Sequence, residues 1–226
     1  MKSYLRQLGA IVWKDVVVEL RTRERIGAMA AFAVLAGVLF NYAVDPAEVS
    51  LRELAAGLIW LTIVFGGMLG LARTFQMEEE EGAFQGLLLS PIPRDALFLG
   101  KLISNFLLLI ATALLIVGVF YLFFDLRLAG SIWILVAVLA EGVFGFAAVG
   151  TLFSAISVRS TMGETLLPIL VFPILIPVVV FGVSATHRIF LGRPLAEVAG
   201  NLRMLGAFGL GAALVGALLF RYVVEE

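Results

Sequence analysis

The chain has 226 residues, of which 62% are hydrophobic and only 15% are charged, and its formal net charge is −1. A typical soluble domain carries about 25% charged residues, so this composition, with a mean hydropathy of +1.07, predicts a polytopic membrane protein. The lack of a basic excess argues against a nucleic-acid-binding surface, and the absence of cysteine excludes disulfides, thiolate metal sites and cysteine nucleophiles.

Residues 1–25 predict an amphipathic helix that lies in the membrane interface. Its apolar residues recur at the spacing of one helix face, while most of its basic residues fall off that face. The apolar positions are Tyr4, Leu8, Ile11, Val12, Val16 and Leu20. Charged residues interrupt the stretch, so it lacks the continuous apolar core of a signal peptide. The alternative is a simple cytoplasmic extension of the first membrane span.

Six apolar runs follow, each close to the length of about 20 residues that a helix needs to cross a bilayer. They are continuous and lack the alternation of membrane β-strands, so helices are expected. The runs cover residues 26–42, 54–71, 103–124, 132–156, 166–183 and 202–224. Because they use more than half of the chain, we expect a single all-α transmembrane domain over residues 1–226.

The distribution of lysine and arginine predicts which side of the membrane each connecting segment faces. Residues 1–25, 72–102, 157–165 and the C-terminal tail contain 11 of the 16 basic residues, and the opposite segments contain 5. Both termini and segment 72–102 are therefore expected in the cytoplasm, with segment 184–203 as an outer loop. A short helix on the outer membrane surface is expected to begin at Pro194.

The segment between the second and third spans reads EEEEGAFQGLLLSPIPRDALFLGK. Its glutamates keep it out of the lipid, and one small apolar face follows at helical spacing. Two prolines stop that helix, because a residue before proline avoids the α region. This pattern predicts a short amphipathic helix that docks into a groove on a cytoplasmic partner, and an ordinary solvated loop is the alternative. The residues of this docking element are Glu78, Glu79, Glu80, Glu81, Gly82, Phe84, Leu87, Leu88, Pro91, Pro93 and Arg94.

Glu141 and three prolines stand out inside the expected spans. A lone carboxylate in hydrocarbon costs several kcal/mol, so Glu141 is expected to face a cavity, a partner or another helix. Glu141 could contact a substrate, take part in a proton relay, or have a purely structural role. The fifth span contains Pro168, Pro173 and Pro177. Each proline removes a backbone donor and crowds the preceding turn, so this helix is expected to be kinked or broken.

No motif for soluble-type catalysis is present. The single histidine, His187, falls in the expected outer loop, where a solvated side chain is the ordinary state. Gly100 and Lys101 match the end of a phosphate-binding P-loop, but Asp95 stands where that motif needs its first glycine and Leu102 where it needs a hydroxyl. We therefore expect no catalytic residue, no metal site and no tightly bound cofactor in this chain.

The architecture and motifs resemble those of ABC-2-type permeases. The interfacial helix, the six spans and the pattern E-x-x-E-G…LLLSP…R…GK over residues 78–101 are typical of that superfamily. The proline-rich fifth span, LLPILVFPILIPVVVFG, and the ending YVVEE narrow the resemblance to CcmB, the family of haem-exporter-type permeases of cytochrome c maturation. The resemblance runs over nearly the whole chain.

This resemblance implies a permease subunit that is not itself an enzyme and that works as a pair. A separate CcmA-like subunit would hydrolyse ATP, and the docking element would be the coupling element that receives its motion. A CcmC-like haem-handling protein and a small CcmD-like subunit would complete the assembly in the bacterial inner membrane. The complex would export haem, as a substrate rather than a cofactor, or would release the haem-loaded chaperone CcmE.

Two other functions fit the same residues. One is an ABC-2-type exporter subunit for a drug, a lipid or a polysaccharide, because the pattern over residues 78–101 is typical of many such permeases. The other is a passive membrane assembly scaffold without energy coupling. Association with an ATPase would distinguish the scaffold from the haem exporter and from the other ABC-2-type exporter.

Overall fold

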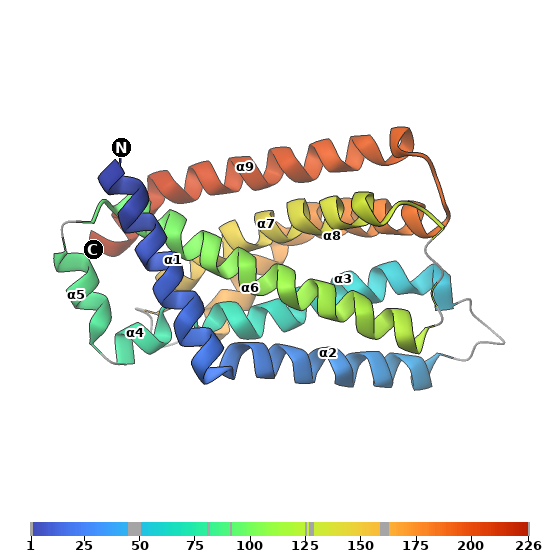
Figure 1. Cartoon of the computed structure of the whole chain (residues 1–226), viewed down its shortest axis with the longest axis horizontal. Coiled ribbons are helices and arrows are strands. Elements are labelled where there is room, and N and C mark those ends of the chain that lie inside the picture. Colours follow the sequence, from blue (N-terminus) through green and yellow to red (C-terminus); the bar gives the residue numbers. More distant parts are fainter. Residues whose placement is uncertain are drawn as a thin grey trace.

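The computed structural model describes the backbone of residues 2–44, 51–80, 82–90, 92–124, 126, 129–158 and 163–225. Within these residues the chain forms nine α-helices and no strand. They are α1 (Lys2–Thr22), α2 (Glu24–Ala43), α3 (Leu51–Ala72), α4 (Gln76–Glu80), α5 (Ala83–Leu89), α6 (Arg94–Phe123), α7 (Ile132–Ser157), α8 (Gly163–Phe190) and α9 (Leu195–Glu225). The long helices form one bundle, α1 lies across it near one end, and α4 and α5 lie beyond that end (Figure 1).

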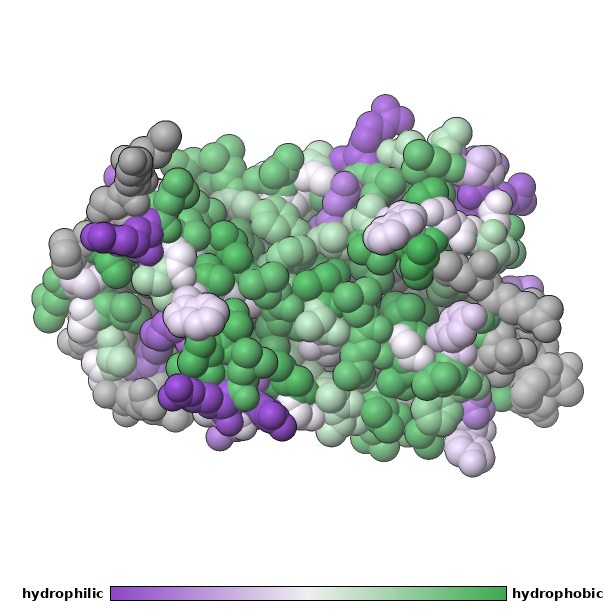
Figure 2. All heavy atoms as spheres, in the orientation of Figure 1, coloured by the Kyte–Doolittle hydropathy of each residue, from purple (hydrophilic) through white to green (hydrophobic). Residues whose placement is uncertain are grey.

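Six of the described helices, α2, α3, α6, α7, α8 and α9, are long and apolar enough to cross a membrane. The prediction of an all-α polytopic membrane protein with six spans is therefore confirmed. Figure 2 shows hydrophobic side chains over the middle of the bundle and most of the hydrophilic ones toward its two ends. Large apolar side chains such as Leu122 and Trp133 are 81% and 78% exposed, which suits a surface that contacts lipid.

The third spanning helix begins earlier than its apolar run. α6 starts at Arg94, with Pro93 directly before it, and continues to Phe123. Lys101 lies in the first turns of α6 and is buried. Its charge interrupts the apolar pattern of the sequence, but the helix continues through it. The connection between α3 and α6 is therefore shorter than the predicted segment 72–102.

At the opposite end of the bundle, most of the predicted loop 184–203 is helical. α8 runs to Phe190, and α9 begins at Leu195 and continues without a break, so the short helix expected at Pro194 is not a separate element. The Arg188 guanidinium donates a hydrogen bond to the backbone oxygen of Glu197 at 2.8 Å. Arg188 at the end of α8 is thus tied to the first turn of α9.

The helix that contains the three prolines is not broken. α8 is continuous from Gly163 to Phe190 with Pro168, Pro173 and Pro177 inside it. Each proline removes one backbone donor, but its fixed φ is close to the helical value. In a bilayer no water competes for the remaining backbone hydrogen bonds, which favours a continuous helix.

α7 packs against α3, α6, α8 and α9, and the interior of the bundle is built around Trp60 of α3. Trp60 is fully buried and contacts Gly142 of α7 and Gly182 of α8, where a side chain would overlap the indole ring. Its Nε1 donates a hydrogen bond to Thr186 Oγ1 of α8 at 2.9 Å. One aromatic side chain therefore sets the separation of three spans.

Gly182→Ala should lower the stability of the bundle. A Cβ at this position would lie 2.5 Å from Trp60 Cε2, and overpacking of this kind costs about 1–3 kcal/mol. Gly211→Ala is the matched control, because nothing lies within 4 Å of that Cβ position in α9. Thermal unfolding of both variants in detergent checks this, and equal midpoints would show that Trp60 does not fix the helix separation.

Candidate functional site

One end of the bundle holds both chain ends together with α1, α4 and α5 (Figure 1), and we call it the α4–α5 end. α4 ends at Glu80, and Gly82, with φ of 68°, lies between it and α5. Glycine adopts this left-handed conformation without steric cost. α5 ends at Leu89, where the Ser90 hydroxyl donates a hydrogen bond to the oxygen of Leu87 at 2.6 Å. The predicted docking helix is therefore two short helices joined through residues 81–82.

The described docking residues differ sharply in burial. Glu78 is buried, whereas Glu79 and Gly82 are exposed and Leu87 is half-buried. Pro93 and Arg94 lie at the start of α6. The side chains of Glu80, Phe84 and Leu88, and all of Glu81 and Pro91, lie outside the described residues, so the apolar face of α5 stays a prediction.

Lys101 of α6 lies at the centre of a buried group of charges. Its side chain is 4% exposed, and its Nζ lies 2.7 Å from Glu78 Oε1 of α4 and 3.2 Å from Asp15 Oδ2 of α1. Lys14 of α1 also forms an ion pair with Glu78. The ammonium of Lys101 lies 5.3 Å from the centre of the Phe75 ring. These contacts join α1, α4 and α6 at one point.

Hydrogen bonds extend this group toward α2 and α7. Arg25 Nη2 of α2 donates to Asn105 Oδ1 of α6 at 2.7 Å, and Arg25 Nε lies 3.9 Å from Glu19 Oε2 of α1. Asn105 Nδ2 donates to Thr151 Oγ1 of α7 at 2.9 Å. Thr74, in the turn after α3, donates from its hydroxyl to Asn105 Oδ1 at 3.2 Å. Asn105 therefore links four segments of the chain.

The charged members form what we call the ion cluster. Three carboxylates face three cations in it, namely Asp15, Glu19 and Glu78 with Lys14, Arg25 and Lys101. Burial disfavours the charge of Lys14, but the carboxylates of Asp15 and Glu78 outweigh burial and raise the pKa of Lys14. Desolvating such groups costs several kcal/mol each, which pairing offsets, so the removal of one partner leaves a buried charge uncompensated.

α1 is attached along the first turns of α6 by more than the ion cluster. Tyr4 Oη donates a hydrogen bond to Asp95 Oδ2 at 2.9 Å. Ile11 covers Gly100, where a Cβ would lie 2.8 Å from Ile11 Cγ2. Trp13 is 71% exposed, as expected for an aromatic ring in the membrane interface. The amphipathic helix predicted over residues 1–25 is thus fixed to the third span.

Glu141 does not belong to this site. It lies on α7 where that helix meets α9, and its carboxyl faces Gly206. Its Oε2 is buried and has no hydrogen-bond partner among the described residues. Thr151, the member of the polar group on α7, lies about 15 Å further along the helix axis. Glu141 and the α4–α5 end are therefore separate features of the molecule.

Asp15, Arg25, Lys101 and Asn105 were not predicted as site residues. Lys101 and Asn105 lie one helical turn apart on α6 and share a face, which is a signal for a polar contact at the edge of a span. Their partners cannot be found from spacing, because Glu78 and Asp15 precede Lys101 by 23 and 86 positions.

The chemistry of this site is electrostatic. Among the described residues, no group of three or more His, Asp or Glu side chains could hold a metal ion. The carboxylates of the ion cluster face ammonium and guanidinium groups instead. Such an arrangement fixes helices relative to one another.

Comparison with known proteins agrees with this architecture. The family model described as "CcmB protein" matches residues 6–225. The chain is 27% identical to "Heme exporter protein B" of Rhodobacter capsulatus over 197 residues, which cover 85% of this chain and 90% of the relative. It is 28% identical to the protein of the same name from Escherichia coli strain K12 over 205 residues, covering 89% and 91%. The relative from Haemophilus influenzae is 27% identical over 202 residues, covering 89% and 90%.

Lys101→Met should destabilise the fold strongly. Methionine keeps the length of the side chain but leaves Asp15 and Glu78 buried without their central cation, which costs about 3–5 kcal/mol. Thermal unfolding in detergent measures this. Lys14→Met is the control, because Lys14 is 44% exposed and its loss should matter less. The double variant Lys101→Met with Glu78→Gln should recover part of the lost stability. Equal losses of stability in Lys101→Met and Lys14→Met would contradict the central role of Lys101.

Proposed function

This chain belongs to the CcmB family, and on that premise we propose that it is the permease subunit of an ABC transporter for cytochrome c maturation. The name "Heme exporter protein B" of its relatives supports haem as the substrate of the complex. In this proposal a separate CcmA-like subunit hydrolyses ATP, and the permease couples that hydrolysis to haem export or to release of a haem-loaded chaperone. The chain itself carries out no chemistry.

The observation that carries the proposal is the attachment of α4 to the ion cluster through Glu78. A coupling element has to be joined firmly to the spans that it moves. Glu78 pairs with Lys101 of α6 at 2.7 Å, and Asp15 of α1 pairs with the same ammonium. A displacement of α4 would therefore reach α6 and α1 directly and, through Asn105, would reach α2 and α7.

The α4–α5 end faces the cytoplasm in this proposal, and the protein lies in the bacterial inner membrane. An even number of spans brings both termini to one side, and segments 1–25 and 72–102 carry most of the basic residues, as the positive-inside rule requires. The ATPase subunit then meets α4 and α5 directly. A second copy of the chain, a CcmC-like protein and a small CcmD-like subunit are the further partners.

Capture of the full chain in mild detergent tests the proposed assembly. We expect an ATPase and a haem-binding membrane protein to co-purify with it, and mass spectrometry identifies both. An ATPase without any haem-handling protein would favour an exporter for a drug, a lipid or a polysaccharide. The absence of any ATPase would favour a passive scaffold.

The coupling element is tested by the double variant Leu87→Glu with Leu88→Glu. Two carboxylates on the apolar face predicted for α5 should abolish co-purification of the ATPase, and they should also abolish cytochrome c maturation. The amount of the protein in the membrane should equal that of the wild type. Gly86→Glu is the matched control, because position 86 lies on the opposite side of the helical wheel and is exposed, with open space at its Cβ. Full ATPase association of the double variant would overturn the assignment.

A further inference from the structure

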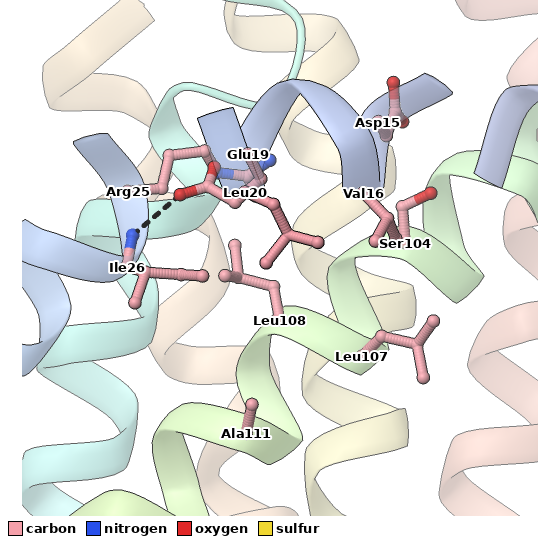
Figure 3. Close-up of a pocket in the computed structure, with 10 residues that line it drawn as sticks. All are labelled: Asp15, Val16, Glu19, Leu20, Arg25, Ile26, Ser104, Leu107, Leu108 and Ala111. Atoms are coloured by element: carbon pink, nitrogen blue, oxygen red, sulfur yellow. Dashed lines mark hydrogen bonds and ion pairs between the residues drawn. The ribbon is translucent and has the colours of Figure 1, made fainter. Parts of the chain in front are cut away.

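A pocket of about 160 Å³ lies beneath the turn that joins α1 to α2 (Figure 3). Its wall is mostly apolar, and α1, α2 and α6 all contribute to it. The apolar lining residues are Val16, Leu20, Ile26, Leu107, Leu108 and Ala111. If α1 lies in the membrane interface, as its amphipathic pattern predicts, the pocket lies at the depth where phospholipid headgroups give way to acyl chains.

The polar side of the pocket contains a donor without an acceptor. Asp15, Glu19 and Arg25 of the ion cluster line this side, and Figure 3 shows them above the apolar residues. Glu19 Oε1 accepts a hydrogen bond from the backbone N–H of Ile26 at 2.9 Å. Arg25 Nε is buried and has no hydrogen-bond acceptor in the described part of the chain, because its ion-pair partner Glu19 Oε2 lies 3.9 Å away, beyond hydrogen-bond reach. A buried unpaired N–H is costly, so a ligand that supplies an oxygen acceptor here is favoured.

The turn above the pocket is basic. Arg23 lies in this turn between the pocket residues Leu20 and Arg25, and its Nε donates a hydrogen bond to the backbone oxygen of Leu20 at 3.4 Å. Arg21 and Arg23 are both exposed, and neither forms an ion pair with a carboxylate among the described residues. Arg23 also has φ of 56°, the only positive value found at a described residue other than glycine. Arg23 thus occupies a position where glycine would fit without strain.

We propose that this pocket binds an anionic glycerophospholipid. One acyl chain enters between Leu20, Leu107 and Leu108, and the phosphate pairs with Arg23 at the turn. An ester or phosphate oxygen lies on the side of Arg25 Nε. The ligand class follows from the combination of an apolar wall, an unpaired buried donor and unpaired cations at the depth of the headgroups, where each such cation contributes about 1 kcal/mol of attraction. The bound lipid holds α1, α2 and α6 together beside the ion cluster.

Native mass spectrometry of the delipidated full-length protein tests the proposal, with dioleoyl phosphatidylglycerol and dioleoyl phosphatidylcholine as probes. The wild type should bind the anionic lipid more tightly. Arg23→Gly should weaken the binding of phosphatidylglycerol about fivefold, which corresponds to one lost cation, and Arg23→Lys should largely preserve it. Glycine suits the φ of this position, so the fold of Arg23→Gly is kept, and thermal unfolding verifies this.

The proposed binding of an acyl chain is tested separately, by a substitution that fills the pocket. Ala111→Phe adds a ring to the wall on α6 and should reduce binding of both lipids. Ala31→Phe on α2 is the control, because Ala31 is likewise exposed but does not line the pocket. The proposal is overturned if Arg23→Gly binds phosphatidylglycerol as tightly as the wild type, if the two lipids bind equally well to the wild type, or if Ala111→Phe has no more effect than Ala31→Phe.

Discussion

The structure depends on how one buried ammonium group is neutralised. Lys101 lies in α6 near the membrane boundary with its side chain 4% exposed, and an isolated cation there would be unstable. The carboxylates that compensate it come from α1 and from α4, two segments far apart in the sequence. The positions of α1 and of α4 are therefore set by the same charge.

This arrangement divides the α4–α5 end into a fixed part and a free part. α4 is bound through Glu78 to the ion cluster, whereas α5 follows Gly82 and ends at Leu89, which is 88% exposed. Buried, balanced charges resist separation because each carries a large desolvation cost when it is left alone. Force applied to α4 would therefore move α1 and α6 with it.

The sequence predicts the spans well, because an uninterrupted apolar run has one stable arrangement in a bilayer. It predicts their ends poorly, since helices such as α6 and α9 extend beyond the apolar runs into charged turns. The site was predicted only in part. Glutamates and prolines indicated the region, but the pairing of Glu78 with Lys101 depends on the packing of α1, α4 and α6. Lys101 was read as part of the pattern over residues 78–101 and of a failed nucleotide motif, but its burial was not predicted, because its partners lie far away in the sequence.

The members of the ion cluster are also synthesised in a fixed order. Synthesis runs from the N-terminus, so Asp15, Glu19, Arg25 and Glu78 all leave the ribosome before Lys101, and Thr151 on α7 follows later still. Until α6 has been inserted, the interfacial helix has no central cation to hold it, and the carboxylates of α1 and α4 remain hydrated. The N-terminal helix can therefore form its ion pair with Lys101 only after the third span has been made, so the full set of contacts around Lys101 is completed late in synthesis.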